Sequence, residues 1–216
     1  MAARESILGK IRRRQQRGGS SPASAELEQM TTYLRRRPRG PLPPLGEDLV
    51  VRFLSRAEAS AASVERVAGE AQVPAAVARY LDAHQLSKSG CVWPSLARLD
   101  WSAAGLELEA RAARGEDLLG VTGVFCALAE TGTLVVASGA DTPSSVSLLP
   151  ETHVAVVPLE RLVAHMEDAW ELLRAEFGHL PRAVNFISGP SRTADIEQTL
   201  VLGAHGPYRV HVVLVG

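Results

Sequence analysis

The stretch HVAVVPLERLVAHMEDAWELLRAEFG, residues 153–178, joins an apolar run to a long amphipathic segment. Residues 153–158 are nearly all apolar, a pattern typical of a strand buried on both faces of a sheet. The apolar residues that follow recur at the three- and four-residue intervals of a helix: Leu159, Leu162, Val163, Met166, Trp170, Leu173 and Phe177. Gly178 would end that helix. The stretch therefore predicts a buried strand followed by an amphipathic helix.

The flanking sequence continues this alternation. The apolar runs RAVNFI (182–187) and YRVHVVLV (208–215) predict two more buried strands, and we expect a helix between them that begins among Ser191, Arg192 and Thr193. Earlier segments predict helices in residues 47–59 and 73–86, and strands at SVERV, CVW, LELEA and in two runs within residues 120–138. Strands without polar alternation, separated by amphipathic helices, favour a parallel sheet. The predicted fold is α/β, an open mixed and largely parallel sheet flanked by helices.

The N-terminal region differs in charge from the rest of the chain. Residues 1–40 carry ten Arg or Lys and three Glu, whereas the remainder carries 13 basic and 21 acidic residues, so an arm of +7 precedes a region of −8. We divide the chain into a basic helical arm with a Pro-rich linker, residues 1–46, and an α/β domain, residues 47–216. Such an arm suits nucleic acid, an acidic membrane or an acidic partner subunit, and the alternative is a solvated, partly disordered arm. Nucleic-acid binding is disfavoured, because Tyr33 is the only aromatic residue in the arm.

Composition limits the remaining classes of function. No apolar run approaches the roughly 20 residues of a membrane span, and the N-terminus has no secretory h-region, so we expect a cytoplasmic protein. Cys91 and Cys126 stand far apart and cannot by themselves hold zinc or an iron–sulfur cluster. His153, His165 and His179 are scattered, and we interpret them as structural. We therefore expect no metal or other cofactor bound by the residues of this chain.

The segment SGPSRTADIE, residues 188–197, follows a predicted strand and is the first candidate site. Ligands of open α/β sheets collect beyond the C-terminal strand ends, and the N–H groups of a first helical turn favour an anion. The predicted ligand contacts are Gly189, Pro190, Ser191, Arg192, Thr193, Asp195 and Glu197. A simple helix cap is the alternative, because Ser and Thr are common at N-caps. A nucleophile elbow is disfavoured, because Thr193 stands where GxSxG needs glycine.

The segment ETGT, residues 130–133, interrupts two apolar runs and is the second candidate site. Gly132 would let the backbone approach a ligand closely, and Thr131 and Thr133 would offer hydroxyls. Glu130 is the candidate catalytic residue, because partly buried carboxylates serve as acids, bases or nucleophiles. The alternative is a hairpin turn with Glu130 facing water. Since both segments interrupt core strands, we expect them to face one crevice that binds a small carboxylate or phosphate.

Three stretches carry a resemblance to a known family. AETGTLVV, LLPETHVAVVP and NFISGPSRTADIEQTLVLGAHGPYRVHVVLV resemble the LUD-domain family, most closely its lactate-utilization protein C branch, over roughly residues 47–216. The resemblance implies a fold similar to the NagB/RpiA/CoA-transferase group and a role in growth on L-lactate. It also implies iron–sulfur partner subunits that oxidise lactate to pyruvate. This chain lacks the cluster-binding cysteines, so the resemblance implies an accessory component of the L-lactate-oxidising complex and not its redox-active subunit.

Three functional hypotheses follow. In the first, the chain is an accessory subunit for lactate utilization, with an anion-binding crevice and an arm that docks to partners. In the second, it is a stand-alone enzyme of the CoA-transferase or sugar-phosphate isomerase type that uses Glu130 as nucleophile or base. In the third, it is a non-catalytic assembly or regulatory protein. The sequence leaves the oligomeric state open, including a homo-oligomer.

Overall fold

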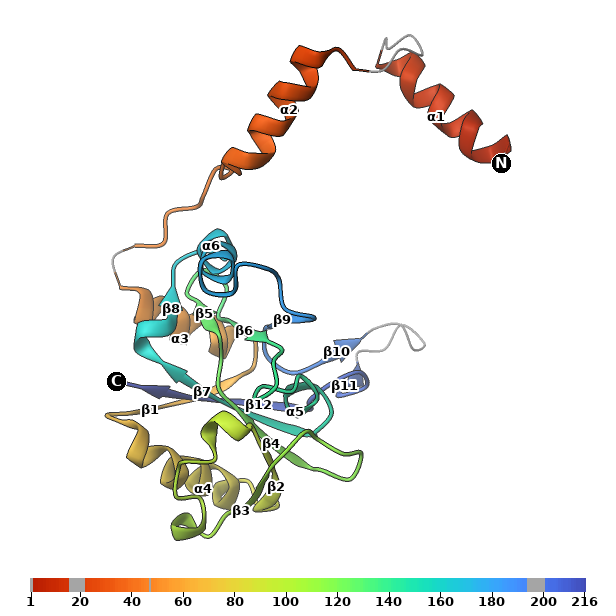
Figure 1. The fold of residues 1–216 in the computed structure, drawn as a ribbon. Helices are drawn as coiled ribbons and strands as arrows, with labels where there is room; N and C mark the ends of the chain where they lie inside the picture. Colours follow the sequence, from red (N-terminus) through yellow and green to blue (C-terminus); the bar gives the residue numbers. More distant parts are fainter. Residues whose placement is uncertain (1, 16–21, 47, 194–200) are drawn as a thin grey trace. The chain divides into compact units, whose positions relative to one another are not determined.

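The computed structural model describes residues 2–15, 22–46, 48–193 and 201–216 (Figure 1). The chain divides into two compact units, Met1–Leu42 and Pro43–Gly216. The first unit contains the helices α1 (Ala2–Arg14) and α2 (Ser24–Arg36). The expected basic helix corresponds to α1, whereas α2 is not among the predicted elements.

A six-stranded sheet forms the centre of the second unit. Its spatial order is β1 (Ser63–Val67), β12 (Arg209–Val215), β7 (Thr152–Pro158), β4 (Leu119–Thr122), β2 (Ser89–Val92) and β3 (Glu107–Ala110). Every pair of neighbouring strands in this sheet is parallel. The expected α/β fold with a largely parallel sheet is confirmed.

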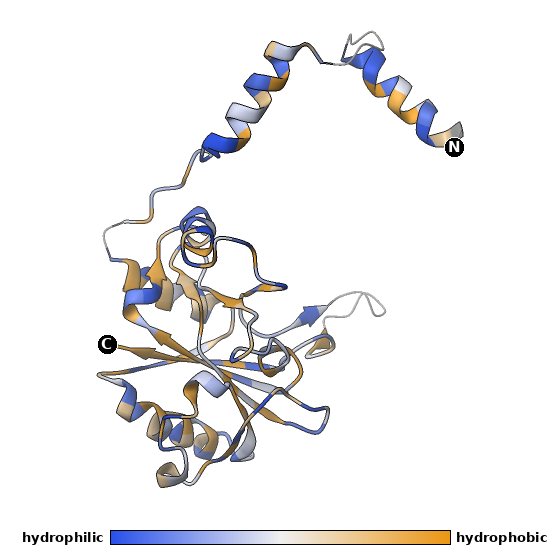
Figure 2. Ribbon diagram, viewed as in Figure 1, coloured by the Kyte–Doolittle hydropathy of each residue, from blue (hydrophilic) through white to orange (hydrophobic). Residues whose placement is uncertain are grey.

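Helices cover both faces of this sheet. Its helical elements are α3 (Leu49–Ala59), α4 (Val73–Ala83) and α5 (Ser145–Leu148), with 3-10 turns η1 (Glu70–Gln72), η2 (Pro94–Leu96), η3 (Ser102–Ala104) and η4 (Leu159–Arg161). Along β7, Val154 and Val156 belong to the core on the α4 side, whereas Ala155 and Val157 belong to the core on the α3 side. Successive strand side chains point to opposite faces, so burial on both sides requires an uninterrupted apolar run. Figure 2 shows the central strands in orange accordingly.

A four-stranded sheet lies on the α3 side. Its order is β8 (Leu162–Val163), β5 (Cys126–Leu128), β6 (Thr133–Ala137) and β9 (Val184–Ile187). The pair β5–β8 is parallel, and the pairs β5–β6 and β6–β9 are antiparallel. Helix α6 (Met166–Phe177) covers the outer face through Ala169 and Leu173. Figure 1 shows the resulting layers as α6, the small sheet with α3, the large sheet and α4.

The helix predicted for residues 159–177 is wrong over its first part. Leu162 and Val163 form β8, which pairs with Ala127 and Leu128 of β5. The helix begins only at Met166. The residue before it, His165, donates its backbone N–H to the Asp168 carboxylate at 2.8 Å. A side chain that satisfies such an N–H fixes where a helix starts.

The region after residue 183 also departs from expectation. The strand in RAVNFI is β9, which pairs antiparallel with β6 in the small sheet instead of joining the parallel sheet. The helix expected to begin among residues 191–193 is replaced by β10 (Arg192–Thr193), paired antiparallel with β11 (Val201–Leu202). Asp195 and Glu197 lie outside the described residues. Residues 191–193 therefore form no helix N-terminus that could bind an anion.

Candidate functional site

The ETGT turn and the SGPSRT segment lie together in the structure. The Oγ1 atoms of Thr131 and Thr133 are 2.7 Å apart, and Thr133 Oγ1 is 2.6 Å from Ser188 Oγ. The three hydroxyls form a chain from the β5–β6 turn to the residue that follows β9. Two segments separated by more than 50 residues in sequence are thereby joined by side-chain hydrogen bonds.

Both segments also place a glycine against the C-terminal end of α3. Gly132 has a φ of +68°, and a Cβ there would lie 2.3 Å from the backbone nitrogen of Ala57. Gly189 has a φ of +71°, and a Cβ there would lie 2.0 Å from the carbonyl oxygen of Ser60. The same carbonyl oxygen lies 3.5 Å from Arg192 Nη2, at the outer limit of a hydrogen bond. The space that the sequence assigned to a ligand beside Gly132 is thus occupied by the backbone of α3.

Glu130 is paired with a histidine. Its Oε2 lies 3.0 Å from His165 Nδ1, and the two side chains are 26% and 13% exposed. The backbone N–H of Glu130 donates to the carbonyl of Ala164 at 3.0 Å, which holds the turn beside the residue preceding α6. A carboxylate and an imidazole at this distance can exchange a proton, or they can anchor α6 to the turn. From sequence, His165 is interpreted as structural, and its pairing with Glu130 is not predicted because 35 residues separate the two.

The histidine near the C-terminus is not a base for Ser191. His211 Nδ1 lies 2.8 Å from Ser63 Oγ, and its ring stacks on Tyr80 with centroids 3.9 Å apart. Burial lowers the pKa of His211 to about 4. The backbone N–H of Ser191 instead donates to the carbonyl of Pro207 at 2.9 Å. The geometry agrees with the disfavoured nucleophile elbow at Ser191, because the His211 imidazole bonds Ser63 instead.

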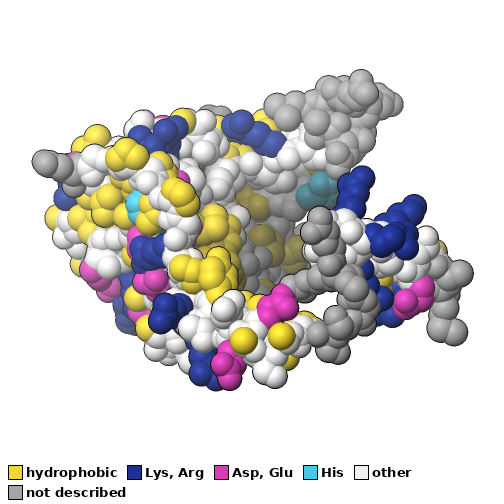
Figure 3. Space-filling view, turned by 90° about the horizontal axis from the view of Figure 1, so that it is seen from above, with side chains coloured by type: hydrophobic (Ala, Val, Ile, Leu, Met, Phe, Trp, Pro, Cys, Tyr) yellow, Lys and Arg dark blue, Asp and Glu magenta, His cyan; other side chains and the backbone are white. Residues whose placement is uncertain are grey.

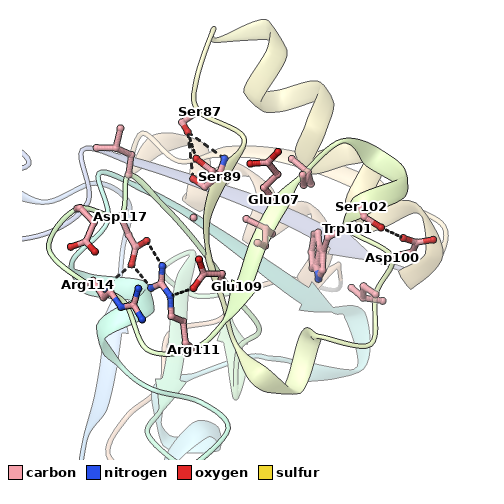
Figure 4. Close-up of a pocket in the computed structure, with 16 residues that line it drawn as sticks. Ser87, Ser89, Asp100, Trp101, Ser102, Glu107, Glu109, Arg111, Arg114 and Asp117 are labelled. Carbon is pink, nitrogen blue, oxygen red and sulfur yellow. Dashed lines mark hydrogen bonds and ion pairs between the residues drawn. The ribbon is translucent and has the colours of Figure 1, made fainter.

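A cavity of about 780 Å³ follows β3 at the edge of the large sheet (Figure 4). Within it, Arg111 Nη1 and Nη2 donate to the two carboxylate oxygens of Asp117 at 2.6 and 2.9 Å. Arg111 Nε donates to Glu109 Oε2 at 2.6 Å. The Arg111 guanidinium lowers the pKa of Asp117 to about 2. The sequence of this region, LELEA, predicts only a strand, because alternating Glu and apolar residues are ordinary for a sheet edge.

Residues 50–215 match the sequence model of the LUD domain. The chain belongs to the LUD-domain family. Its relatives include "Lactate utilization protein C" of Bacillus subtilis (strain 168), 38% identical over 133 residues that cover 56% of this chain and 55% of that protein. The protein of the same name from Halalkalibacterium halodurans (strain C-125) is 47% identical over 100 residues, 45% of this chain and 44% of that protein. The chain therefore spans about half the length of the curated relatives it matches.

A solved structure has the same fold as this LUD-domain chain. It is described as a DUF162 family protein from Deinococcus radiodurans, and the comparison gives a TM-score of 0.60. The match covers 78% of this chain and 96% of that chain at 24% sequence identity. At this identity the likeness establishes the architecture of the LUD domain and does not establish a ligand.

The LUD domain contains two buried thiols. Cys91 and Cys126 are free, and burial raises the pKa of each thiol to about 12. Both are therefore protonated at neutral pH, when only a thiolate would be a good nucleophile. In the described ranges, no three or more His, Cys, Asp and Glu side chains are grouped as metal ligands. None of the described helices has the length and apolar content that a bilayer span needs.

Proposed function

We propose that this chain is an accessory component of L-lactate utilization that binds a small carboxylate or phosphate. The observation that carries the proposal is its 38% and 47% identity to proteins named Lactate utilization protein C, together with the LUD-domain match over residues 50–215. In this proposal, iron–sulfur partner subunits oxidise lactate to pyruvate and accept the electrons. The LUD-domain chain contributes a binding surface to the assembly.

The proposed ligand surface is formed by the exposed side chains of Thr131, Ser188 and Arg192, and the buried hydroxyl of Thr133 joins the first two. The chain of hydroxyls supports this choice, because hydroxyl groups can reorient to donate to an anion. Arg192 is exposed, and its guanidinium carries several N–H donors in a planar fork that matches a carboxylate or phosphate. Gly132 and Gly189 set the positions of these groups against α3 and are not proposed as ligand contacts.

The proposed docking element for partner subunits is the N-terminal unit. Helix α2 has no buried residue, and Leu27, Met30 and Leu34 are 49%, 49% and 68% exposed at helical intervals. An isolated helix of 13 residues is marginally stable in water, so packing of this apolar face on a partner would stabilise it. Residues 1–40 carry ten Arg or Lys and three Glu, which favours an acidic partner surface. Figure 3 shows Lys and Arg in dark blue and Asp and Glu in magenta on one face of the molecule.

The lactate role is tested by gene deletion and complementation in the source organism. We expect the deletion strain to lose growth on L-lactate and to keep growth on pyruvate, and the wild-type gene to restore growth on lactate. The variant Arg192→Ala should fold normally and fail to restore it. Growth on lactate that survives the deletion would exclude the proposed pathway. Full restoration by Arg192→Ala would retain the pathway and exclude the ligand surface.

The Glu130–His165 pair favours a second candidate, a stand-alone enzyme of the CoA-transferase or sugar-phosphate isomerase type. The partly buried carboxylate would act as nucleophile or base, with the imidazole as its proton partner. Such an enzyme turns over without partner subunits, and Glu130→Gln should abolish its activity. If the purified chain turns over neither acyl-CoA with a carboxylate nor a sugar phosphate, while deletion still prevents growth on lactate, the accessory role is the one that remains.

A further inference from the structure

The outer strand of the six-stranded sheet has an unpaired side. β3 is the last strand in the sheet order, so within the described residues no strand lies beyond it. The N–H groups of Glu107 and Arg111 donate toward β2, to the carbonyls of Lys88 and Val92 at 2.9 and 3.2 Å. In a parallel ladder, alternate residues direct both backbone groups to the same side. Leu108 and the next even-numbered residue, Ala110, therefore direct their N–H and C=O groups outward.

The cavity of about 780 Å³ follows this same strand (Figure 4). Apolar side chains from before β3, among them Leu99, Trp101 and Leu106, form part of its lining. Trp101 and Leu106 are only 6% and 2% exposed, so they form a buried, packed base of the cavity. The lining also includes residues of β3 and of its neighbour β2, so the cavity lies at the free edge of the sheet, where an extended segment can add as a strand.

The rim of the cavity is acidic. Its lining includes four exposed carboxylates, those of Asp100, Glu107, Glu109 and Glu116. Arg114 is the only cation in the lining besides Arg111, whose charge the buried Asp117 offsets. The rim is therefore complementary to a segment that carries Arg or Lys.

A second copy of this chain would be a poor occupant of the edge. Two β3 strands paired side by side would bring the Glu107 and Glu109 carboxylates of both copies together, and like charges directly opposite are destabilising. Charged side chains on an edge strand also protect it from pairing with its own kind. Protecting the edge against self-pairing would need only the charged side chains and no cavity. The cavity beside those charges therefore favours an added strand from a partner of opposite charge.

We propose that β3 is a docking edge for an extended, basic segment of another polypeptide, which adds to the sheet as a further strand. Its backbone would bond the outward groups of Leu108 and Ala110, and its Arg or Lys side chains would meet Glu107 and Glu109. The proposal rests on the sheet edge, its cavity and the acidic rim, so it is independent of the lactate role.

The probe is a fluorescein-labelled hexapeptide of alternating Val and Arg, titrated with the full-length chain and followed by fluorescence anisotropy. A peptide with Glu in place of Arg should not bind. A further peptide keeps the Val and Arg side chains and carries an N-methyl group on every backbone nitrogen. It cannot donate N–H groups to β3 in either strand direction, so it should lose binding. Undiminished binding of this methylated peptide would exclude strand addition, as would no binding of the parent peptide.

Variants of the chain locate the site. Reversing charge at Glu107 and Glu109 together (E107K/E109K) should weaken peptide binding by more than about tenfold. Ala110→Pro, which removes one outward N–H, should weaken it as well. The matched control E58K/E160K reverses two exposed glutamates elsewhere and should bind as the wild type does. Far-UV circular dichroism verifies that each variant is folded. Equal weakening by the control pair, or self-association that Ala110→Pro abolishes, would overturn the proposal.

Discussion

Replacing Asp117 by asparagine removes the buried carboxylate beside β3. The Asp117 side chain is 5% exposed, and its Oδ2 accepts from both Arg111 Nη1 and the backbone N–H of Arg114 at 2.6 Å. Hydrogen bonding from Arg111 is the main reason why the pKa of Asp117 is about 2 instead of 3.8, although burial opposes the shift. The ionised form is therefore favoured in the folded state.

The pKa difference sets both the size and the pH range of the effect. A carboxyl group whose folded pKa is below its unfolded pKa stabilises the fold above the unfolded value, and this stabilisation is lost as the pH falls toward the folded value. At 1.36 kcal/mol per pKa unit, a shift from 3.8 to about 2 corresponds to roughly 2 kcal/mol. We expect Asp117→Asn to lower the free energy of unfolding by about that amount at pH 7, and by progressively less between pH 4 and pH 2.

Urea unfolding of the full-length chain, followed by far-UV circular dichroism at pH 7, 5, 3 and 2.5, measures this difference. Glu109→Gln is the matched control, because Glu109 also contacts Arg111 but its side chain is 66% exposed and its ion pair is screened by solvent. The control should lose much less stability at pH 7. A loss for Asp117→Asn that is the same at pH 2.5 as at pH 7 would refute the argument that the carboxylate charge carries the stabilisation.

Three further predictions concern the LUD domain. Gly189→Ala should destabilise it by more than about 2 kcal/mol in urea unfolding, whereas Gly178→Ala, at a similar positive φ with no atom near its Cβ, should cost only about 1 kcal/mol. Burial lowers the pKa of His153 to about 4, so His153 should contribute a loss of stability of at most about 3 kcal/mol as the pH drops from about 6.5 to 4, and His153→Gln should remove this contribution while that of His211 remains. Thr133→Val should weaken inorganic phosphate binding in calorimetry and leave the fold intact, because it removes the hydroxyl that joins the Ser188 chain; an unchanged affinity would exclude this hydroxyl.

The parallel sheet could be predicted because its central strands are buried on both faces. A run such as residues 153–158 has no polar alternation only when each face is covered, and this property is visible in sequence. The start of α6 could not be predicted in the same way. Leu162 and Val163 fit a helical stripe equally well, and their pairing with Ala127 and Leu128 depends on a strand more than 30 residues away.

The candidate site was predictable in part. The interruption of two core strands correctly indicated that ETGT and SGPSRT lie close together, because strand ends gather at common edges of sheets. The inferred start of a helix among Ser191, Arg192 and Thr193 was wrong, because Arg192 and Thr193 form β10 and pair with β11, and residues 194–200 lie outside the described residues. The contact between Glu130 and His165 has no local signal, since it depends on how the turn meets the residue before α6.

The structure separates the residues that build the candidate site from those that can act in it. Gly132 and Gly189 abut backbone atoms of α3, so substitutions there disturb the fold, and a lost function would not identify a ligand contact. Arg192 carries an exposed side chain on the same segment as Gly189, and the buried hydroxyl of Thr133 bonds Ser188 Oγ. Changing either side chain adds no atom between the two glycines and α3. If a glycine variant loses ligand binding only together with stability, the glycine has a scaffold role. If an Arg192 variant loses ligand binding while it is fully stable, Arg192 has a ligand role.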